Sequence, residues 1–177
     1  MAGSELQSAS APSPLRLADD GELLVAGRHR ATMQEVEDMF VLNAPYEADR
    51  RRIWSAFEVY ESEVRRLLPG ARLWLDGGFV TLKQWGAPKD VDVCIVATRE
   101  EMAAVGAAAI RPLLTQTTSE GERIQPMSGL VDGFLTYSKP DPNAQTAYWA
   151  HQWSRVRDWQ GNEDPARRKG YVEVMTA

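Results

Sequence analysis

The 177-residue sequence has few of the residues that build disulfides and zinc sites, with a single cysteine, Cys94, and two histidines. One cysteine cannot form an intrachain disulfide, and it excludes a zinc site made of several cysteines. The sequence also lacks an apolar run of about 18 residues, the length that spans a bilayer. Its first residues do not combine a basic segment with an apolar one, as a secretory signal does. These absences predict a cytoplasmic protein with no membrane partner.

The chain also has fewer basic than acidic residues, which gives a formal net charge of −5. An acidic chain does not favour a nucleic-acid-binding class, and clustered carboxylates that hold a cation would contribute to that sign. The hydrophobic and charged fractions, 44% and 25%, are typical of a globular protein. We expect residues 1–15 to form a disordered tail rich in Ser, Ala and Pro. Residues 16–177 then form one domain, with an arm and helical pair over 16–70 and a sheet core over 71–177.

The hydrophobic periodicity predicts an α/β (α+β) fold, a small mixed sheet flanked by helices with an N-terminal helical pair. The predicted helices cover 33–42, 46–68, 99–114 and 146–159, and the predicted strands cover 72–76, 90–97, 130–137 and 171–175. A polar loop is expected between the last helix and the last strand. We interpret Trp149 and Trp153 as core residues. The run 50–52 of three arginines is interpreted as a solvated helix face rather than a surface for RNA or protein.

Two aspartates carry the chemistry that the sequence suggests. Residues two apart in a strand point to the same face, so Asp90 and Asp92 project together while Val91 and Val93 face the core. Adjacent carboxylates repel each other unless a cation lies between them. Oxygen ligands of this kind suit Mg²⁺ or Mn²⁺. The alternative is that both aspartates are ordinary charges at a strand edge.

Gly77 and Gly78 follow the strand that precedes these aspartates. Glycines allow close approach of the backbone to a ligand, and a helical turn after them would offer free N–H groups to phosphate. Lys83, in the connector 79–89, is a candidate contact for a triphosphate. Asp76, just before the glycines, is interpreted as a turn residue or a support for the site. A glycine-bound phosphate beside a carboxylate-held metal is the arrangement that phosphoryl and nucleotidyl transfer require.

This pattern resembles the signature of the DNA polymerase β-like nucleotidyltransferase superfamily: an apolar strand, Gly-Gly or Gly-Ser, a spacer, and Asp-x-Asp between apolar residues. Here the spacer has 11 residues, 79–89. The chain also resembles a narrower bacterial and phage group of unknown function, with the strand motif W-L-D-G-[GS]-F-V-T-x-K. That motif corresponds to residues 74–83, and the arm 20–29 and the closing segment 169–174 fit the same group.

The superfamily resemblance implies a third carboxylate on a later strand. Asp132 is the first choice, because it lies one predicted helix downstream of the aspartate pair, and Glu173 is the second. By this resemblance Asp90, Asp92 and Asp132 would hold Mg²⁺ and act in catalysis, with Asp132 as metal ligand or base. Gly133 is an unusual strand residue and could mark a bulge at that position.

Three functions fit these expectations. The first is a nucleotidyltransferase that moves an NMP from an NTP to a hydroxyl of RNA (tRNA included) or protein, which the resemblance associates with toxins and defence. The second is an inactive protein of the same fold that binds or regulates a phage or bacterial partner. The third is an adenylyltransferase that modifies a cationic antibiotic.

Overall fold

The computed structural model describes residues 15–138 and 143–175, and their fold is a mixed α/β arrangement. Except for residue 15, the predicted disordered tail lies outside the described residues. The strands are β1 (Gly27–Ala31), β2 (Arg72–Asp76), β3 (Val91–Ala97), β4 (Gln116–Thr117), β5 (Arg123–Ile124), β6 (Val131–Tyr137), β7 (Arg155–Arg157), β8 (Glu163–Arg168) and β9 (Gly170–Val174). The helices are α1 (Met33–Phe40), α2 (Glu47–Leu67), α3 (Arg99–Val105), α4 (Ala107–Ile110), the 3₁₀ helix η1 (Arg111–Leu113), α5 (Pro126–Gly129) and α6 (Ala144–Trp153).

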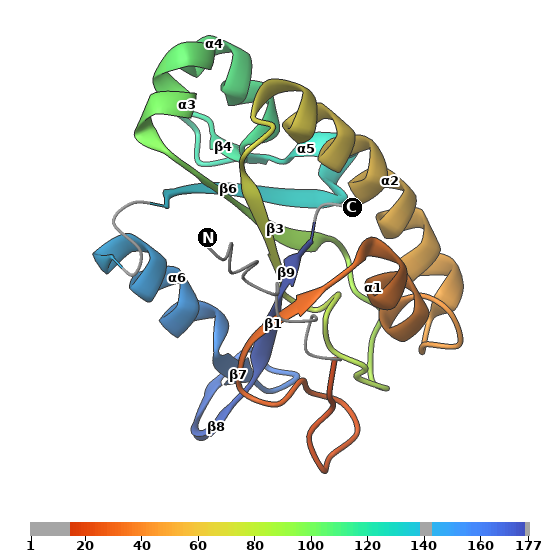
Figure 1. Cartoon of the computed structure of the whole chain (residues 1–177). Coiled ribbons are helices and arrows are strands. Elements are labelled where there is room, and N and C mark those ends of the chain that lie inside the picture. Colours follow the sequence, from red (N-terminus) through yellow and green to blue (C-terminus); the bar gives the residue numbers. More distant parts are fainter. Residues whose placement is uncertain (1–14, 139–142, 176–177) are drawn as a thin grey trace, which may run out of the picture.

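The main sheet has five strands in the order β1-β9-β2-β3-β6 (Figure 1). Both edge strands pair in parallel with their neighbours, whereas β9–β2 and β2–β3 are antiparallel. The last strand of the chain therefore lies between the first and the second. This insertion brings residues near 170 beside residues near 75.

One face of the sheet packs on the N-terminal helical pair. Strand alternation directs Val91, Val93 and Ile95 to this face, where they join the buried residues of α1 and α2 in the larger core. Thr32 and Glu35 form a capping box at the start of α1, and Thr98 and Glu101 form another at the start of α3. The helical pair that the periodicity predicted is thus confirmed.

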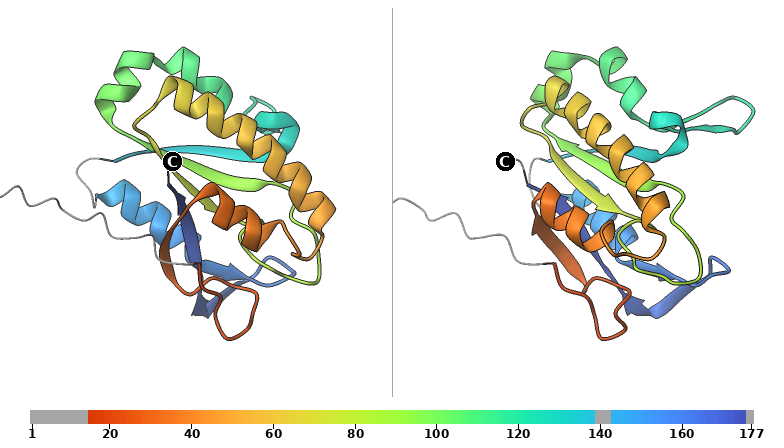
Figure 2. Two further views of the ribbon diagram at one scale, coloured as in Figure 1. Left: turned by 45° about the vertical axis from the view of Figure 1, so that its right-hand side comes forward. Right: turned by 90° about the vertical axis from the view of Figure 1, so that its right-hand side faces the viewer.

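The opposite face of the sheet packs on α6. Trp74, Cys94 and Tyr171 form a second cluster with Trp153, and Trp149 packs against it. The turned views show α6 and the β7–β8 hairpin across the sheet from α2 (Figure 2). Trp153 is therefore a core residue, as the sequence indicated. Because α6 covers only part of this face, the ends of β2 and β3 that carry Asp76 and Asp92 line a cleft.

Two predicted helices are shorter than expected. The helix predicted over 99–114 is interrupted at Gly106, whose φ of 85° is incompatible with a continuous helix. The helix predicted over 146–159 ends at Trp153, and the polar loop expected after it contains strand β8, paired with β7. These strands were missed because they are charged and lack apolar alternation. Their connecting turn is stabilised by Asp158, which accepts hydrogen bonds from the N–H groups of Gln160 and Asn162, each 2.9 Å long.

Candidate functional site

A row of three aspartates crosses three adjacent strands of the sheet. Asp76 of β2 is the register partner of Asp92 of β3, and Asp92 is the register partner of Asp132 of β6. Directly opposed side chains on one face of a sheet lie about 5 Å apart at their Cβ atoms. The sequence predicted Asp92 and Asp132 as partners, but it placed Asp76 in a supporting role. We call Asp76, Asp92 and Asp132 the aspartate row.

Asp90 lies one residue before β3, at the side of the row. It is half-buried, and its Oδ2 accepts a hydrogen bond of 2.7 Å from the side-chain amide of Gln125. Its charge is close enough to Asp92 to contribute to the raised pKa of that residue. The two aspartates of the sequence motif therefore act on each other electrostatically, although only Asp92 belongs to the strand.

Asp76 is buried and is paired with Lys169, whose ammonium group donates to Asp76 Oδ1. Burial raises the pKa of Asp76 to about 6, and the charge of Lys169 and a backbone N–H of Gly77 oppose that rise. Lys169 lies immediately before β9, and the insertion of β9 beside β2 brings the two groups together although they are 93 residues apart in sequence. Through this buried pair, the positive charge of Lys169 is held at the end of the aspartate row.

Asp92 is the member of the row without an ion-pair partner in the described part of the chain. Burial, and after it repulsion from Asp76, Asp90 and Asp132, together raise its pKa to about 7. Lys169 lowers that pKa, but its effect is the smallest of those acting on the group. The negative charge of Asp92 is therefore poorly compensated by its surroundings, and a bound cation would stabilise it.

Asp132 is buried, and both of its carboxylate oxygens have partners. The hydroxyl of Thr115 donates to Oδ1 at 2.6 Å, and the guanidinium of Arg123 donates to Oδ2 at 2.5 Å. Arg123 belongs to β5 of the short β4–β5 hairpin, and Gln125, the partner of Asp90, follows it by two residues. One surface segment thus binds two of the three carboxylates that the sequence proposed as metal ligands.

Gly133 forms regular sheet register with Val93, so the bulge considered for this position is absent. A Cβ at Gly133 would overlap the carbonyl oxygen of Leu113, which explains why glycine stands there. Across the described residues, no group of three His, Cys, Asp or Glu side chains is arranged to hold a metal ion. Asp132 is bound to Arg123, and Asp76 is bound to Lys169. These bonds explain why the aspartates do not form such a group, because each bond directs a carboxylate toward a cation of the protein.

Gly77 and Gly78 begin the turn that borders the row. Gly77 has a φ of 78°, and a Cβ on it would overlap the carboxylate of Asp92. Residues 77–80 form a turn and no helix, so the helical turn expected after the glycines is absent. Lys83 approaches this turn, with its ammonium nitrogen 3.2 Å from the position of a Cβ on Gly78. The backbone here is tightly fitted to the aspartate row.

Arg50 fixes the segment that follows the glycines. It is fully buried, and its guanidinium donates to the carbonyl oxygens of Phe40 (2.9 Å), Phe79 (2.6 Å) and Thr81. A further bond of 2.7 Å goes to the carbonyl of Pro45. Burial lowers the pKa of Arg50 to about 10. The interpretation of residues 50–52 as a solvated face is therefore wrong for Arg50, which is a structural strut beneath the glycine turn.

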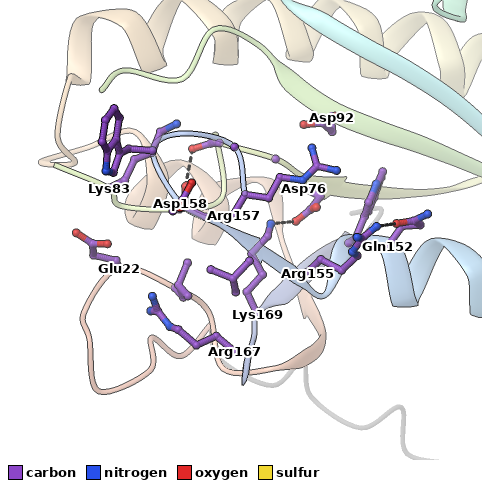
Figure 3. Close-up of a pocket in the computed structure, with 18 of the residues that line it drawn as sticks. Glu22, Asp76, Lys83, Asp92, Gln152, Arg155, Arg157, Asp158, Arg167 and Lys169 are labelled. Atoms are coloured by element: carbon purple, nitrogen blue, oxygen red, sulfur yellow. Dashed lines mark hydrogen bonds and ion pairs between the residues drawn. The ribbon is translucent and has the colours of Figure 1, made fainter. Parts of the chain in front are cut away.

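Two members of the row border a cleft with a volume of about 1090 Å³. Asp76, Asp92, both glycines and Lys83 line it, whereas Asp90 and Asp132 do not. Figure 3 shows Asp76 and Asp92 on the sheet side of the cleft, with Arg155, Arg157 and Lys169 on the hairpin side. Among the described residues, six basic and four acidic side chains line the cleft, a surplus of two positive charges in a chain of net charge −5.

Glu173, the second choice for the third carboxylate, lies elsewhere on the sheet. Its register partner is Trp74, and its carboxylate accepts a 2.8 Å bond from the indole N–H of that residue. Ion pairs with Arg28 (3.4 Å), Arg30 (3.3 Å) and Arg72 (3.3 Å) surround it. Glu173 thus belongs to a separate cluster of arginines and does not extend the aspartate row.

The fold and the cleft together define a class: a mixed α/β protein whose sheet presents carboxylates to a cleft with basic walls. Residues 16–175 match the model of a family described as a family of unknown function (DUF6932), and the chain belongs to that family. No curated protein and no solved structure gives a significant match. In the part of the chain that the structure describes, no helix has both the length and the apolar character needed to cross a bilayer.

Proposed function

We propose that the protein is a divalent-metal-dependent nucleotidyltransferase, and that the aspartate row with Asp90 forms its metal-binding site. The observation that carries this proposal is the alignment of Asp76, Asp92 and Asp132 on three adjacent strands, next to a glycine turn that leaves no room for a side chain at position 77. Carboxylate oxygens are the ligands that Mg²⁺ and Mn²⁺ prefer. The donor chemistry therefore fits such an ion.

The state of Asp92 supports the same proposal. Its pKa is raised to about 7 because burial and three neighbouring carboxylates disfavour its charge. A protein that only needed a stable fold would be more stable with a neutral side chain there. Asp92 and Asp90 would hold the ion, joined by Asp132 once Arg123 releases it. A bound divalent ion would neutralise phosphate charge and polarise the phosphorus that is attacked.

The other residues of the cleft have roles that follow from their positions. Lys83 and the backbone of Gly77 and Gly78 would bind the triphosphate of an NTP. The oxygen of an acceptor hydroxyl forms a bond to the α-phosphorus, and the bond from that phosphorus to the oxygen bridging to the β-phosphate breaks. Pyrophosphate leaves, and the hydroxyl proton passes to an aspartate carboxylate of the row. The acceptor hydroxyl belongs to RNA or protein in this proposal, as the sequence resemblance implies.

Label transfer tests this function directly. The full-length protein is incubated with Mg²⁺, total cell extract and an NTP labelled at either the α- or the γ-phosphate. The proposal expects acceptor labelling from the α-position alone, and none with Asp92→Asn. Labelling from the γ-position would indicate a kinase instead. Equal α-labelling by wild type and Asp92→Asn, or no labelling with any of the four NTPs, would contradict the proposal.

A second candidate is a catalytically inactive protein that binds nucleotide or a protein partner through the same cleft. The bond between Arg123 and Asp132 favours it, because the third carboxylate is withdrawn from the cleft lining. Nucleotide binding that does not depend on metal and gives no transfer would support this candidate. The third function, modification of a cationic antibiotic, is disfavoured by the surplus of positive charge among the cleft residues.

A further inference from the structure

Exposed aromatic side chains gather around the cleft. In the described part of the chain, four aromatic residues are exposed, and the three most exposed line the cleft: Trp85 (56% exposed), Tyr148 (54%) and Trp159 (70%). They come from three separate elements: the connector after the glycines, helix α6, and the β7–β8 hairpin. Large aromatic surface left in water is unfavourable, and its concentration around one cleft indicates a ligand that covers it.

Among these aromatic residues, Trp159 has the position that best suits stacking with a ligand. It lies in the tight turn of the β7–β8 hairpin, directly after Asp158, whose carboxylate holds that turn through bonds to Gln160 and Asn162. The hydrogen bond that the backbone N–H of Asn162 donates to this carboxylate lowers the pKa of Asp158, so the carboxylate is charged at neutral pH. The turn is therefore fixed while the indole at its tip remains in solvent. Such an indole offers a flat, pre-positioned surface for stacking.

Basic side chains without ion-pair partners accompany these rings. Lys83, Lys89 and Arg157 line the cleft and make no ion pair with any residue that the structure describes. The ammonium of Lys83 lies 4.3 Å from the ring centroid of Trp85, so cation and ring form one mixed surface. Arg157 belongs to the same hairpin as Trp159. Alternating cations and aromatic faces match a ligand that alternates phosphates and flat bases.

The position of its residues in the cleft separates this ligand from the NTP. Pockets for small ligands occupy roughly 300–1,000 Å³, and this cleft has about 1090 Å³. The glycine turn and Lys83 lie at the sheet side, whereas Trp159 and Arg157 stand on the hairpin. The hairpin side thus leaves space for a second ligand, and its residues take no part in the metal site proposed above.

We propose that the cleft binds a single-stranded nucleic acid between the β7–β8 hairpin and the connector 79–89, with unpaired bases stacked on Trp159 and Trp85 and phosphates bound by Arg157 and Lys89. The identification of this strand as the acceptor rests on the proposed nucleotidyltransferase function. The strand-binding surface itself does not. A duplex keeps its bases stacked on each other and presents no free base to an indole, so the surface selects single strands.

Fluorescence anisotropy with end-labelled strands tests the proposal on the full-length protein without NTP. The probes are an RNA strand of about 12 nucleotides, a DNA strand of the same sequence, and the corresponding RNA duplex. Wild type should bind a single strand more tightly than the duplex, and the RNA and DNA probes identify which sugar is preferred. Trp159→Ala should weaken strand binding about fivefold to a hundredfold, and Trp159→Phe should restore much of it.

Arginine variants provide the matched control. Arg157→Ala should lower the slope of log K against log salt by about 0.7, the value for one phosphate contact on a single strand. Arg66→Ala removes an exposed arginine from α2, far from the cleft lining, and should leave the slope unchanged. Circular dichroism verifies that each variant folds. Equal binding of strand and duplex, or Trp159→Ala binding the strand as wild type does, would overturn the proposal.

Two further results separate this proposal from the function it extends. Asp92→Asn should bind the strand at least as tightly as wild type, because it removes a negative charge from the cleft. Strand binding that depends on Trp159 without any nucleotidyl transfer would refute the enzyme but leave the strand-binding surface intact. Binding of mononucleotides that depends on Trp159, together with no strand binding, would refute the strand and assign the aromatic side chains to the NTP.

Discussion

Arg123 of the β4–β5 hairpin donates a 2.5 Å hydrogen bond to Asp132, the residue aligned with Asp92 on the neighbouring strand. Arg123 is 54% exposed, whereas Asp132 is buried. An exposed surface cation thus neutralises a buried carboxylate that belongs to the proposed metal-binding site. In the proposed metal site, a metal ion would compete with the Arg123 guanidinium for the same oxygen, so this contact would control access of the ion to Asp132.

Replacement of Arg123 by Ala should therefore strengthen binding of Mn²⁺, by about fivefold to tenfold if the coupling is near 1 kcal/mol, the size of an exposed ion pair. Isothermal titration calorimetry with Mn²⁺ measures this change. Arg66→Ala, which removes a comparably exposed arginine from α2, serves as the control. Unchanged or weaker Mn²⁺ binding by Arg123→Ala would show that the arginine does not compete with metal.

The substitution Asp92→Asn should stabilise the metal-free protein, and increasingly so as the pH rises. The pKa of Asp92 is raised from 3.8 to about 7 in the folded protein, so folding favours its protonated form. This group therefore lowers the free energy of unfolding progressively as the pH rises from about 4 to above 7. A fully buried group with this shift would cost roughly 4 kcal/mol, and contact with water reduces the expected gain to about 1–2 kcal/mol at pH 8.

Thermal melts in EDTA buffer at about pH 4 and pH 8 measure the effect of Asp92→Asn. The melting temperatures of variant and wild type should nearly coincide at the lower pH and separate at the higher one. Asp19→Asn, a change at an exposed aspartate, controls for the loss of a charge as such. An Asp92→Asn protein less stable than wild type at pH 8 would mean that the carboxylate has a stabilising partner.

At Gly77, substitution by Ala should destabilise the protein by more than about 2 kcal/mol, because backbone strain and a steric clash act together. Gly77 has a φ of 78°, and its Cβ would overlap the carboxylate of Asp92. Gly121→Ala is a matched control: it has a φ of 86° but open space around the added Cβ. It should cost about 1 kcal/mol. Chemical denaturation compares the two, and equal losses would show that the glycine turn is not fitted to Asp92.

Arg50 offers a test of the support beneath that turn. Arg50→Met keeps the length of the side chain but leaves the buried carbonyls of Phe40, Phe79 and Thr81 without a donor. Each unsatisfied buried carbonyl costs about 1–3 kcal/mol, so a loss of at least about 3 kcal/mol is expected. Arg51→Met, at an exposed neighbour, should change stability by less than about 0.5 kcal/mol. Similar effects of the two changes would exclude Arg50 as a strut.

The sequence was informative where a local period or a short motif determines structure. Strand alternation placed Asp92 on one face and Val91 and Val93 on the other, and the helical pair forms where the periodicity predicted it. Arg50 could also have been found, since it lies at i, i+3, i+4 and i+7 with the buried residues Ile53, Trp54 and Phe57. The charge of the side chain favoured a solvated position, whereas its place on the buried face of α2 favoured burial.

Other parts of the site depend on topology, which no local pattern encodes. The pairing of Lys169 with Asp76 follows from the insertion of β9 between β1 and β2. The contact of Arg123 with Asp132 follows from a hairpin whose strands have only two residues each. The β7–β8 hairpin, with its exposed Trp159, was predicted partly as helix and partly as loop because β7 has only three residues and β8 is charged on both faces. Residues from these segments form most of the basic wall of the cleft.

The central claim, that the aspartate row binds a divalent cation, is tested most directly by electron paramagnetic resonance of Mn²⁺ titrated with protein. Loss of the free-ion signal should reveal binding to wild type that tightens when an NTP is added. Asp92→Asn should weaken this binding at least tenfold, and Asp19→Asn should leave it unchanged. Mn²⁺ binding of equal strength by wild type and Asp92→Asn, with or without NTP, would contradict the account.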